Sequence, residues 1–205
     1  MPSYLLPTSS NFSCVQETKT KLLYPLSLCE VKRHLRIDND FVDDDDYLTG
    51  LIQTATMIAE NYIEKDIAKT EVVLRIDEFD SDWIRINEGN FLSVVSVLDS
   101  NNASIGTIHQ TSKHDDFFQI EWTTSICSDP LTITYYSGFN EDETPAIIKQ
   151  AILIKIADLY DSQRADLNWS GLTDNKVFEQ ILNFHVVPVH SHNPAEVNVP
   201  LVSVT

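Results

Sequence analysis

Apolar residues in the first third of the chain recur with the spacing of an α-helix. Between residues 44 and 64 they fall at positions i, i+3, i+4 and i+7, which predicts one long amphipathic helix over 44–64. Four consecutive aspartates, at 43–46, stand where this helix begins. We expect these carboxylates to cap free backbone N–H groups and to complement the positive end of the helix dipole.

A shorter helix is predicted just before it, over residues 27–37. Ser27 and Glu30 have the S-x-x-E spacing of a capping box, in which each side chain satisfies a free backbone N–H of the other residue. Leu26 and Val31 stand at the positions of a hydrophobic staple that flanks the box. Both signals place the start of this helix at Ser27.

The hydrophobic period changes to two between residues 71 and 136. This alternation predicts an antiparallel β region of about five or six strands. Turn-prone residues, among them Asn101 and Asn102, separate the alternating segments. The candidate strands are 72–77, 83–86, 94–98, 105–108, 118–123 and 131–135.

Helical spacing returns after the β region. Thr144 is expected to be an N-cap, and Pro145 fits the first helical position, where its missing N–H costs no hydrogen bond. The apolar pattern extends this helix over 145–164 and covers more than one of its sides, which indicates burial on more than one side. A fourth helix is predicted over 173–184.

The two ends of the chain lack helical periodicity. Residues 1–25 carry scattered prolines, serines and threonines, which favours an extended N-terminal arm. Prolines at 188, 194 and 200 exclude a continuous helix, so 185–205 is predicted as an extended C-terminal arm. The predicted class is α+β: over residues 26–184, a bundle of about four helices carries an inserted small antiparallel β subdomain.

The charge of the chain is strongly negative. Its 31 acidic residues against 14 basic ones give a formal net charge of −17. Such a chain repels phosphate, so groove reading of DNA is not expected, whereas an acidic wall past which DNA slides is compatible with the charge. A solvated acidic surface that keeps the protein soluble is the simpler interpretation.

Compartment signals are sparse. Cys14, Cys29 and Cys127 show no CxxC spacing, which fits a reducing cytosol. The first residues lack a basic segment followed by an apolar one, so no secretory signal is predicted. No apolar run approaches the roughly 18 residues of a membrane span, and no membrane partner is expected.

The sequence gives no strong signal for a metal site or a catalytic site. His185, His190 and His192 match no zinc spacing, and the contiguous acids at 43–46 lack the alternation and central glycine of an EF-hand loop. Carboxylate pairs for hydrolysis depend on distances that a sequence does not give. The common nucleophile, phosphate and zinc-protease motifs do not occur. We therefore predict no catalytic residue, no cofactor and no metal.

The last alternating segment of the β region is followed by Gly138, and the helix that starts at Pro145 ends near Tyr160 and Arg164. This order of features resembles the head–tail connector (adaptor) proteins of tailed bacteriophages. In that family the last strand ends in a glycine, and a proline-started helix ends near a tyrosine and an arginine. The segment 89–97 departs from the family, which often has a proline before the middle strand. The matching stretches, in order, are 26–38, 43–63, 131–139 and 144–164.

The resemblance implies a structural part of a virion and not an enzyme. It implies a ring, usually of twelve copies, stacked beneath the portal protein in the neck and joined to a stopper or tail-completion protein. Such a ring lines the exit path of the DNA, which passes through it without sequence-specific binding. It also implies that the protein passes through the host cytoplasm during assembly.

The C-terminal arm is the main interface candidate. Its alternating valines are suited to adding a strand to the sheet edge of a partner, while a disordered end is the alternative. The interface residues that we expect are Val186, Val187, Val189, Val197, Val199, Leu201, Val202, Tyr160 and Arg164.

Two other functions stay open on the sequence alone. One is a different neck or tail component, such as a stopper, a tail terminator or a tail-completion protein. The other is a small hydrolase or ligand-binding protein that uses the acidic residues around the β region. A pocket lined by convergent acids would favour the second.

Overall fold

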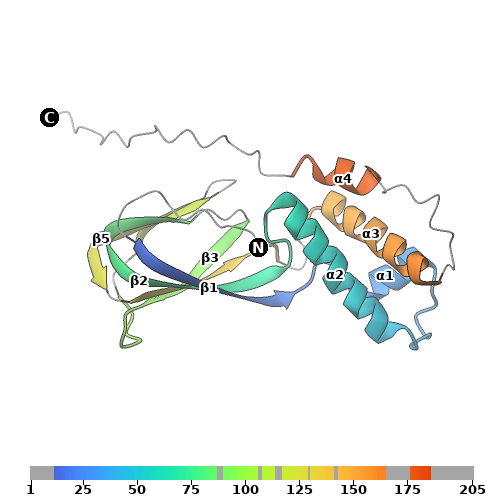
Figure 1. Cartoon of the computed structure of the whole chain (residues 1–205), viewed down its shortest axis with the longest axis horizontal. Coiled ribbons are helices and arrows are strands. Elements are labelled where there is room, and N and C mark those ends of the chain that lie inside the picture. Colours follow the sequence, from blue (N-terminus) through green and yellow to red (C-terminus); the bar gives the residue numbers. More distant parts are fainter. Residues whose placement is uncertain are drawn as a thin grey trace.

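The computed structural model describes residues 12–86, 90–105, 108–113, 117–128, 130–140, 143–164 and 176–185. The described part is a mixed α+β fold, which confirms the predicted class, with a sheet at one end of the molecule and helices at the other (Figure 1). The helices are α1 (Leu28–Leu35), α2 (Asp45–Ile63), α3 (Ala146–Arg164) and α4 (Lys176–Leu182). The strands are β1 (Phe12–Leu23), β2 (Lys69–Ile86), β3 (Phe91–Leu98), β4 (Ile108–Lys113), β5 (Phe118–Ser128) and β6 (Leu131–Ser137).

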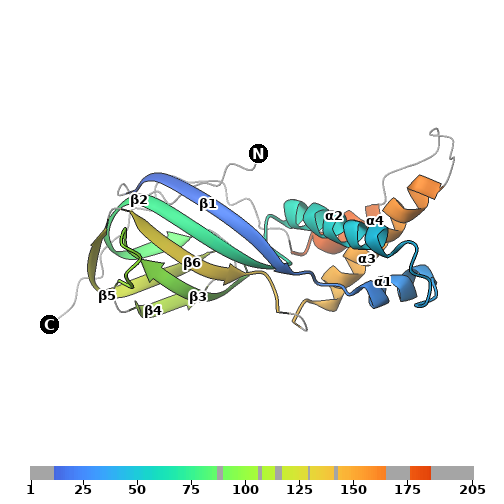
Figure 2. The ribbon, with the colours of Figure 1, turned by 90° about the horizontal axis from the view of Figure 1, so that it is seen from below.

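The sheet is antiparallel and is organised around the long strand β2. Its path runs β3-β6-β2-β5-β4, and β1 pairs with β2 off this path. β5 and β6 pair with successive parts of β2. Phe79 pairs with Ser128 at the end of β5, and Ile76, three residues earlier in β2, pairs with Leu131 at the start of β6. The sheet curves around its buried face (Figure 2).

Two strand predictions differ from the structure. The candidate strands 72–77 and 83–86 are one strand, β2, which continues through an acid-rich stretch. Phe79 explains this continuity, because it is 2% exposed and points inward between outward-facing acids. The candidate strand 105–108 lies further along the chain, as β4 (Ile108–Lys113). Ile105 itself belongs to the turn after β3, where its backbone N–H donates to the carbonyl of Val97.

The expected N-terminal arm over 1–25 needs correction. Residues Phe12–Leu23 form β1, which pairs antiparallel with β2 from Phe12 opposite Phe79 onwards. The sheet is therefore not wholly an insertion between the helices, because one of its strands precedes them. β1 has a polar sequence with little alternation, so its strand conformation comes from pairing with β2 and not from a local signal.

The curved sheet encloses its own hydrophobic core. Along β6 the buried positions alternate, and Leu131, Ile133 and Tyr135 are at most 1% exposed. Phe91 from β3 stacks on Phe118 from β5 with ring centroids 4.0 Å apart. This core accounts for the period of two in the sequence, since every second side chain enters it.

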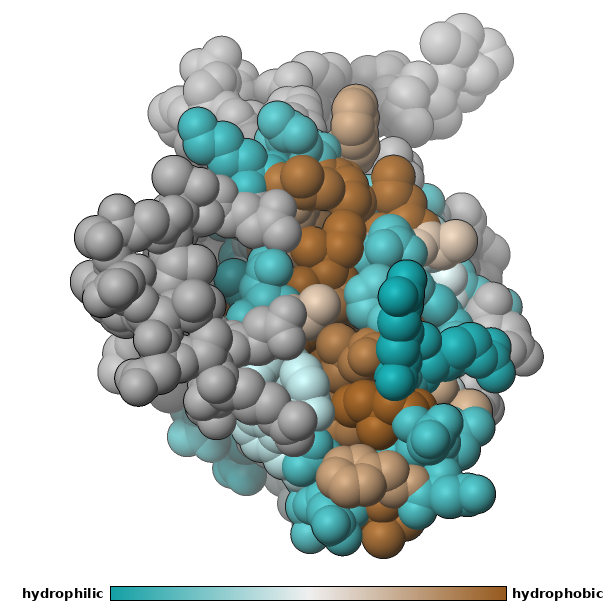
Figure 3. Space-filling model, turned by 90° about the vertical axis from the view of Figure 1, so that its right-hand side faces the viewer, coloured by the Kyte–Doolittle hydropathy of each residue, from teal (hydrophilic) through white to brown (hydrophobic). Residues whose placement is uncertain are grey.

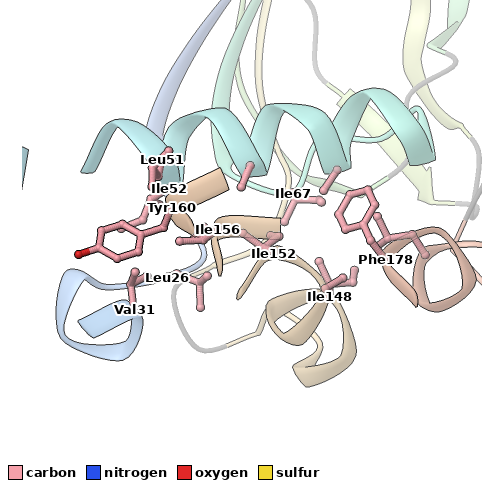
Figure 4. Close-up of a cluster of buried hydrophobic side chains, with 14 of the residues drawn as sticks. Leu26, Val31, Leu51, Ile52, Ile67, Ile148, Ile152, Ile156, Tyr160 and Phe178 are labelled. Atoms are coloured by element: carbon pink, nitrogen blue, oxygen red, sulfur yellow. The ribbon is translucent and has the colours of Figure 1, made fainter. Parts of the chain in front are cut away.

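The helices enclose a second core. Side chains from α1, α2, α3 and α4 meet there, and Figure 4 shows Ile148, Ile152, Ile156 and Tyr160 of α3 directed between the other helices. Ile152 and Ile156 are 0% exposed. Truncating one such isoleucine to alanine would cost about 2–5 kcal/mol of stability. No helix in the described part of the chain is long and apolar enough to cross a membrane.

The helix bounds follow the sequence signals closely but not in every detail. α3 begins at Ala146, and the carbonyl of Pro145 accepts the first i→i+4 bond, from the N–H of Lys149. α4 is shorter than the predicted 173–184 within the described residues. The N-cap residue of α2 is Asp44, and its side chain makes no capping hydrogen bond. The prediction that this aspartate caps the helix is therefore wrong.

Candidate functional site

The start of α1 is built as the sequence predicts. The backbone N–H of Ser27 donates to Glu30 Oε2 at 2.8 Å, and the N–H of Glu30 donates to Ser27 Oγ at 3.3 Å. The hydrogen bond from the Ser27 backbone lowers the pKa of Glu30, against an opposing effect of burial. Leu26 and Val31, the expected staple, are both buried. This box fixes how the chain enters the helical end of the molecule.

The loop between α1 and α2 is held by a buried lysine. Lys32 is 3% exposed, and its Nζ donates to the carbonyls of Asn39 at 3.2 Å and Phe41 at 2.7 Å. The same ammonium group forms an ion pair with Asp45 in the first turn of α2. A buried ammonium is tolerated only when it is hydrogen-bonded and its charge is balanced, and here two carbonyls accept its hydrogen bonds and a carboxylate balances its charge.

Tyr160, one of the expected interface residues, is a buried residue of α3. It is 7% exposed, and its hydroxyl donates to Asp44 Oδ2 at 2.8 Å. Its ring lies 6.0 Å from that of Tyr47. Tyr160 therefore ties α3 to the start of α2 within the chain, through the carboxylate that was expected to cap α2.

The other expected interface residues are Arg164 and seven residues of the C-terminal tail. Arg164 is the last residue of α3. The seven tail residues lie outside the described part of the chain, together with His190 and His192. Their interface role stays a prediction. Within the described residues, no group of three or more histidines, cysteines and acids is arranged to hold a metal ion.

A polar cluster joins the sheet to the helical end, and sequence reasoning missed it. We call it the joint: Lys19 and Lys21 of β1, Glu60 of α2, Asp66, and Ser137 of β6. The Asp66 side chain is 7% exposed and accepts hydrogen bonds from Lys19 at 3.0 Å, from Lys21 at 2.8 Å and from Ser137 at 2.6 Å. One carboxylate therefore binds two different strands.

Glu60 extends the joint into the link between α2 and β2. Its Oε1 accepts from the backbone N–H groups of Ile67 at 2.8 Å and Ala68 at 2.9 Å, and from Lys21 Nζ at 2.8 Å. Burial alone would lower the pKa of Lys21, but the charges of Asp66 and Glu60 outweigh it and raise that pKa above its ordinary value. The carboxylates of Glu60 and Asp66 thus hold parts of the fold together, and each of them lies beside a lysine.

Gly138 completes the joint at the end of β6. Its φ is +91°, and a Cβ added there would lie 2.2 Å from the carbonyl oxygen of Ala68. Its N–H donates to the Asn90 carbonyl at 2.9 Å, and the N–H of Phe139 donates to the Ile67 carbonyl at 3.1 Å. The glycine that ends the last strand is therefore required by a close backbone approach.

Exposed apolar side chains occur on several elements of the described surface. Figure 3 shows the helical end of the molecule, where hydrophobic residues form a band between hydrophilic ones. Isolated exposed apolar residues are ordinary, but neighbouring ones are candidates for contacts. The large exposed ones are Leu22, Phe41, Val42, Met57, Val95, Ile108, Ile147, Val177 and Phe184.

Solved structures with the same fold come from phage-like particles. The chain is similar to one from the "Neck of empty GTA particle computed with C6 symmetry", with a TM-score of 0.67 at 14% identity over 85% of this chain and 98% of that one. A chain from a native gene transfer agent virion gives 0.60 at 15% identity, over 84% and 97%. A chain from a native neck computed with C12 symmetry gives 0.59 at 13% identity, over 85% and 98%.

Sequence comparison gives the family. The chain belongs to the family described as phage gp6-like head-tail connector proteins, which matches residues 25–166. No curated protein matches it. The resemblance found in the sequence is thus confirmed, and the chain is a member of a family of structural virion components that connect head and tail.

Proposed function

We propose that this protein closes into a ring in the neck of a tailed phage or phage-like particle, where it joins the portal protein to a stopper or tail-completion protein. The observation that carries the proposal is the family match over residues 25–166. The C6 and C12 symmetries of the similar necks support a ring of twelve copies. A head-to-tail contact between identical chains closes into a ring when the rotation permits.

The charge of the chain suits a channel for DNA. With a net charge of −17, a ring of such chains repels the phosphate backbone and lets DNA slide past without gripping it. In this proposal the protein acts by position and contact, not by catalysis. It assembles in the host cytoplasm and then stays in the virion neck.

The ring is tested by cryo-electron microscopy of intact particles, with symmetry imposed only after it has been measured. The expected result is a closed ring directly beneath the portal. A ring placed further down the neck would make the protein a stopper or a tail terminator instead. Absence from the neck would overturn the proposal.

The C-terminal arm is proposed to clasp a neighbouring protein through its valines, including Val186, Val197 and Val199. Deleting residues 186–205 should abolish attachment to the neck, because added-strand contacts are lost, and should leave the described domain folded. Sedimentation of particles measures attachment, and circular dichroism of the purified variant measures folding. Normal particle assembly with the truncated chain would exclude the clasp.

A further inference from the structure

The loop between α1 and α2 carries two adjacent exposed apolar side chains. We call residues 38–43 the tip loop. Phe41 is 42% exposed and Val42 is 63% exposed. The tip loop runs from the end of α1 to the start of α2, at the end of the molecule opposite the sheet (Figure 1). A neighbouring pair of large apolar side chains at an outer end is suited to contact with another protein.

The backbone of the tip loop is fixed from both sides. Lys32 Nζ binds the carbonyls of Asn39 and Phe41 from within. The N–H of Phe41 donates to the Asp38 carbonyl at 3.1 Å, and the N–H of Asp45 donates to the Val42 carbonyl at 3.1 Å. The two apolar side chains therefore stand on a loop that is ordered before any partner arrives, which reduces the entropy lost on binding.

The charge around the pair indicates the chemistry of the partner. Asp38, Asp40 and Asp43 are exposed in the tip loop itself. Exposed carboxylates beside an apolar anchor favour a socket with a basic rim and disfavour an acidic surface. A second copy of this chain carries a net charge of −17, and its exposed Arg33 and Arg36 directly precede the same acidic loop, so it is a poor source of such a rim.

Many cationic side chains already have a partner inside the same chain. Some form ion pairs with carboxylates and others lie over aromatic rings, so less of their charge is available to attract the aspartates of a second copy. Those bound to carboxylates are Lys19, Lys21, Lys32, Arg75 and Lys149, and those over rings are Lys69, Arg85 and Lys155.

We infer that the tip loop docks into an apolar socket rimmed by lysine or arginine on a different protein of the neck, and not on a second copy of this chain. Phe41 and Val42 fill the socket, and the three aspartates face its rim. The inference rests on the proposed connector function and adds to it the surface through which one neighbour is held.

The test uses the full-length protein and two purified probes: DNA-filled heads that carry the portal but lack this protein, and tails of the same particle. Three variants are compared with the wild type. Phe41→Ser with Val42→Ser removes the anchor, and Asp40→Lys with Asp43→Lys reverses the charge. The matched control is Val95→Ser with Ile108→Ser, which changes two side chains on the sheet that are 48% and 37% exposed.

The anchor variant should bind heads or tails at least about tenfold more weakly than the wild type, as expected when central anchors are truncated. The charge-reversed variant should also bind more weakly, and wild-type binding should weaken with added salt. The control should bind like the wild type. All variants should keep the far-ultraviolet circular dichroism spectrum of the wild type, because the changed side chains are exposed. The charge-reversed variant should lose a little thermal stability, because Asp43 stands beside the positive end of the α2 dipole.

Two results would overturn the inference while leaving the connector function intact. One is wild-type binding to heads and tails by the anchor variant. The other is loss of self-association by that variant in sedimentation of the protein alone, which would place the tip loop between copies. Failure of the wild type to bind either probe would instead refute the proposed function itself.

Discussion

The joint offers the sharpest test of the structure, through the substitution Asp66→Asn. The wild-type carboxylate is 7% exposed and binds two lysines whose side chains are 22% and 26% exposed. Replacing it with an amide leaves Lys19 and Lys21 beside a neutral group in a half-buried position. Ser137 keeps an acceptor, so the main loss is electrostatic.

The expected cost is about 2–3 kcal/mol of unfolding free energy. Removing one partner of a fully buried ion pair costs about 3–5 kcal/mol. The partial exposure of both lysines, and the remaining contact of Lys21 with Glu60, place this case below that range. For a chain of this size each kcal/mol corresponds to roughly 2–4 °C, so the unfolding midpoint should fall by about 4–12 °C.

The assay is thermal unfolding followed by circular dichroism, with Asp77→Asn as the control. Asp77 lies 3.7 Å from Arg75, and the two side chains are 41% and 53% exposed, so this pair contributes at most about 1 kcal/mol. Hydrogen exchange should also show faster exchange in β1 of the Asp66 variant, since β1 pairs with β2 and is bound to the rest through the joint. Equal unfolding midpoints for the two variants would refute the role of the joint.

A pH series checks the same reasoning independently. The pKa of Lys21 is raised in the folded state, so its contribution is fully present below the ordinary value of 10.5 and is lost as pH rises through the raised value. The wild type should therefore lose more stability than Asp66→Asn between neutral pH and the region above 10.5. Parallel losses in the two proteins would contradict this assignment.

Two further predictions concern local geometry. Gly138→Ala should destabilise the protein by about 2–4 kcal/mol in urea unfolding, because the new Cβ meets a backbone oxygen and φ is positive. The control is Gly50→Ala in α2, where a Cβ meets nothing within 4 Å, so this variant should be neutral or stabilising. Equal effects of the two substitutions would contradict the argument. The pKa of Glu30 is lowered, so its contribution is present above the ordinary value of 4.5 and lost as pH falls through the lowered one. Glu30→Gln should thus be less stable than the wild type at neutral pH, and the difference should shrink as pH falls below 4.5. A difference that does not shrink at all in acid would exclude this role of the charge.

Local signals predicted most of the helical end. The capping box of Ser27 and Glu30 placed the start of α1 within one residue, and the helical spacing of apolar residues gave α2 and α3 nearly to their ends. These features are readable because capping and helix period depend on residues three or four positions apart. The resemblance to the connector family depended on the same stretches and on Gly138.

Contacts between distant segments decided the rest. Asp44 was expected to cap α2, but the hydroxyl of Tyr160, 116 positions away, binds its carboxylate instead. No short pattern in the chain marks the loop of Phe41 and Val42 as ordered, and its backbone is held by the buried Lys32, seven to nine positions earlier in the chain.

The sequence by itself determined the family, the helices and the alternation of the sheet, because each depends on neighbours along the chain. The tertiary structure alone decided that residues 12–23 are a strand and that Asp66 binds Lys19, Lys21 and Ser137, up to 71 positions away. A polar edge strand has little local preference, and an ion cluster has none until folding brings its members together. Their stability comes from pairing and charge across the fold, which no short pattern in the chain records.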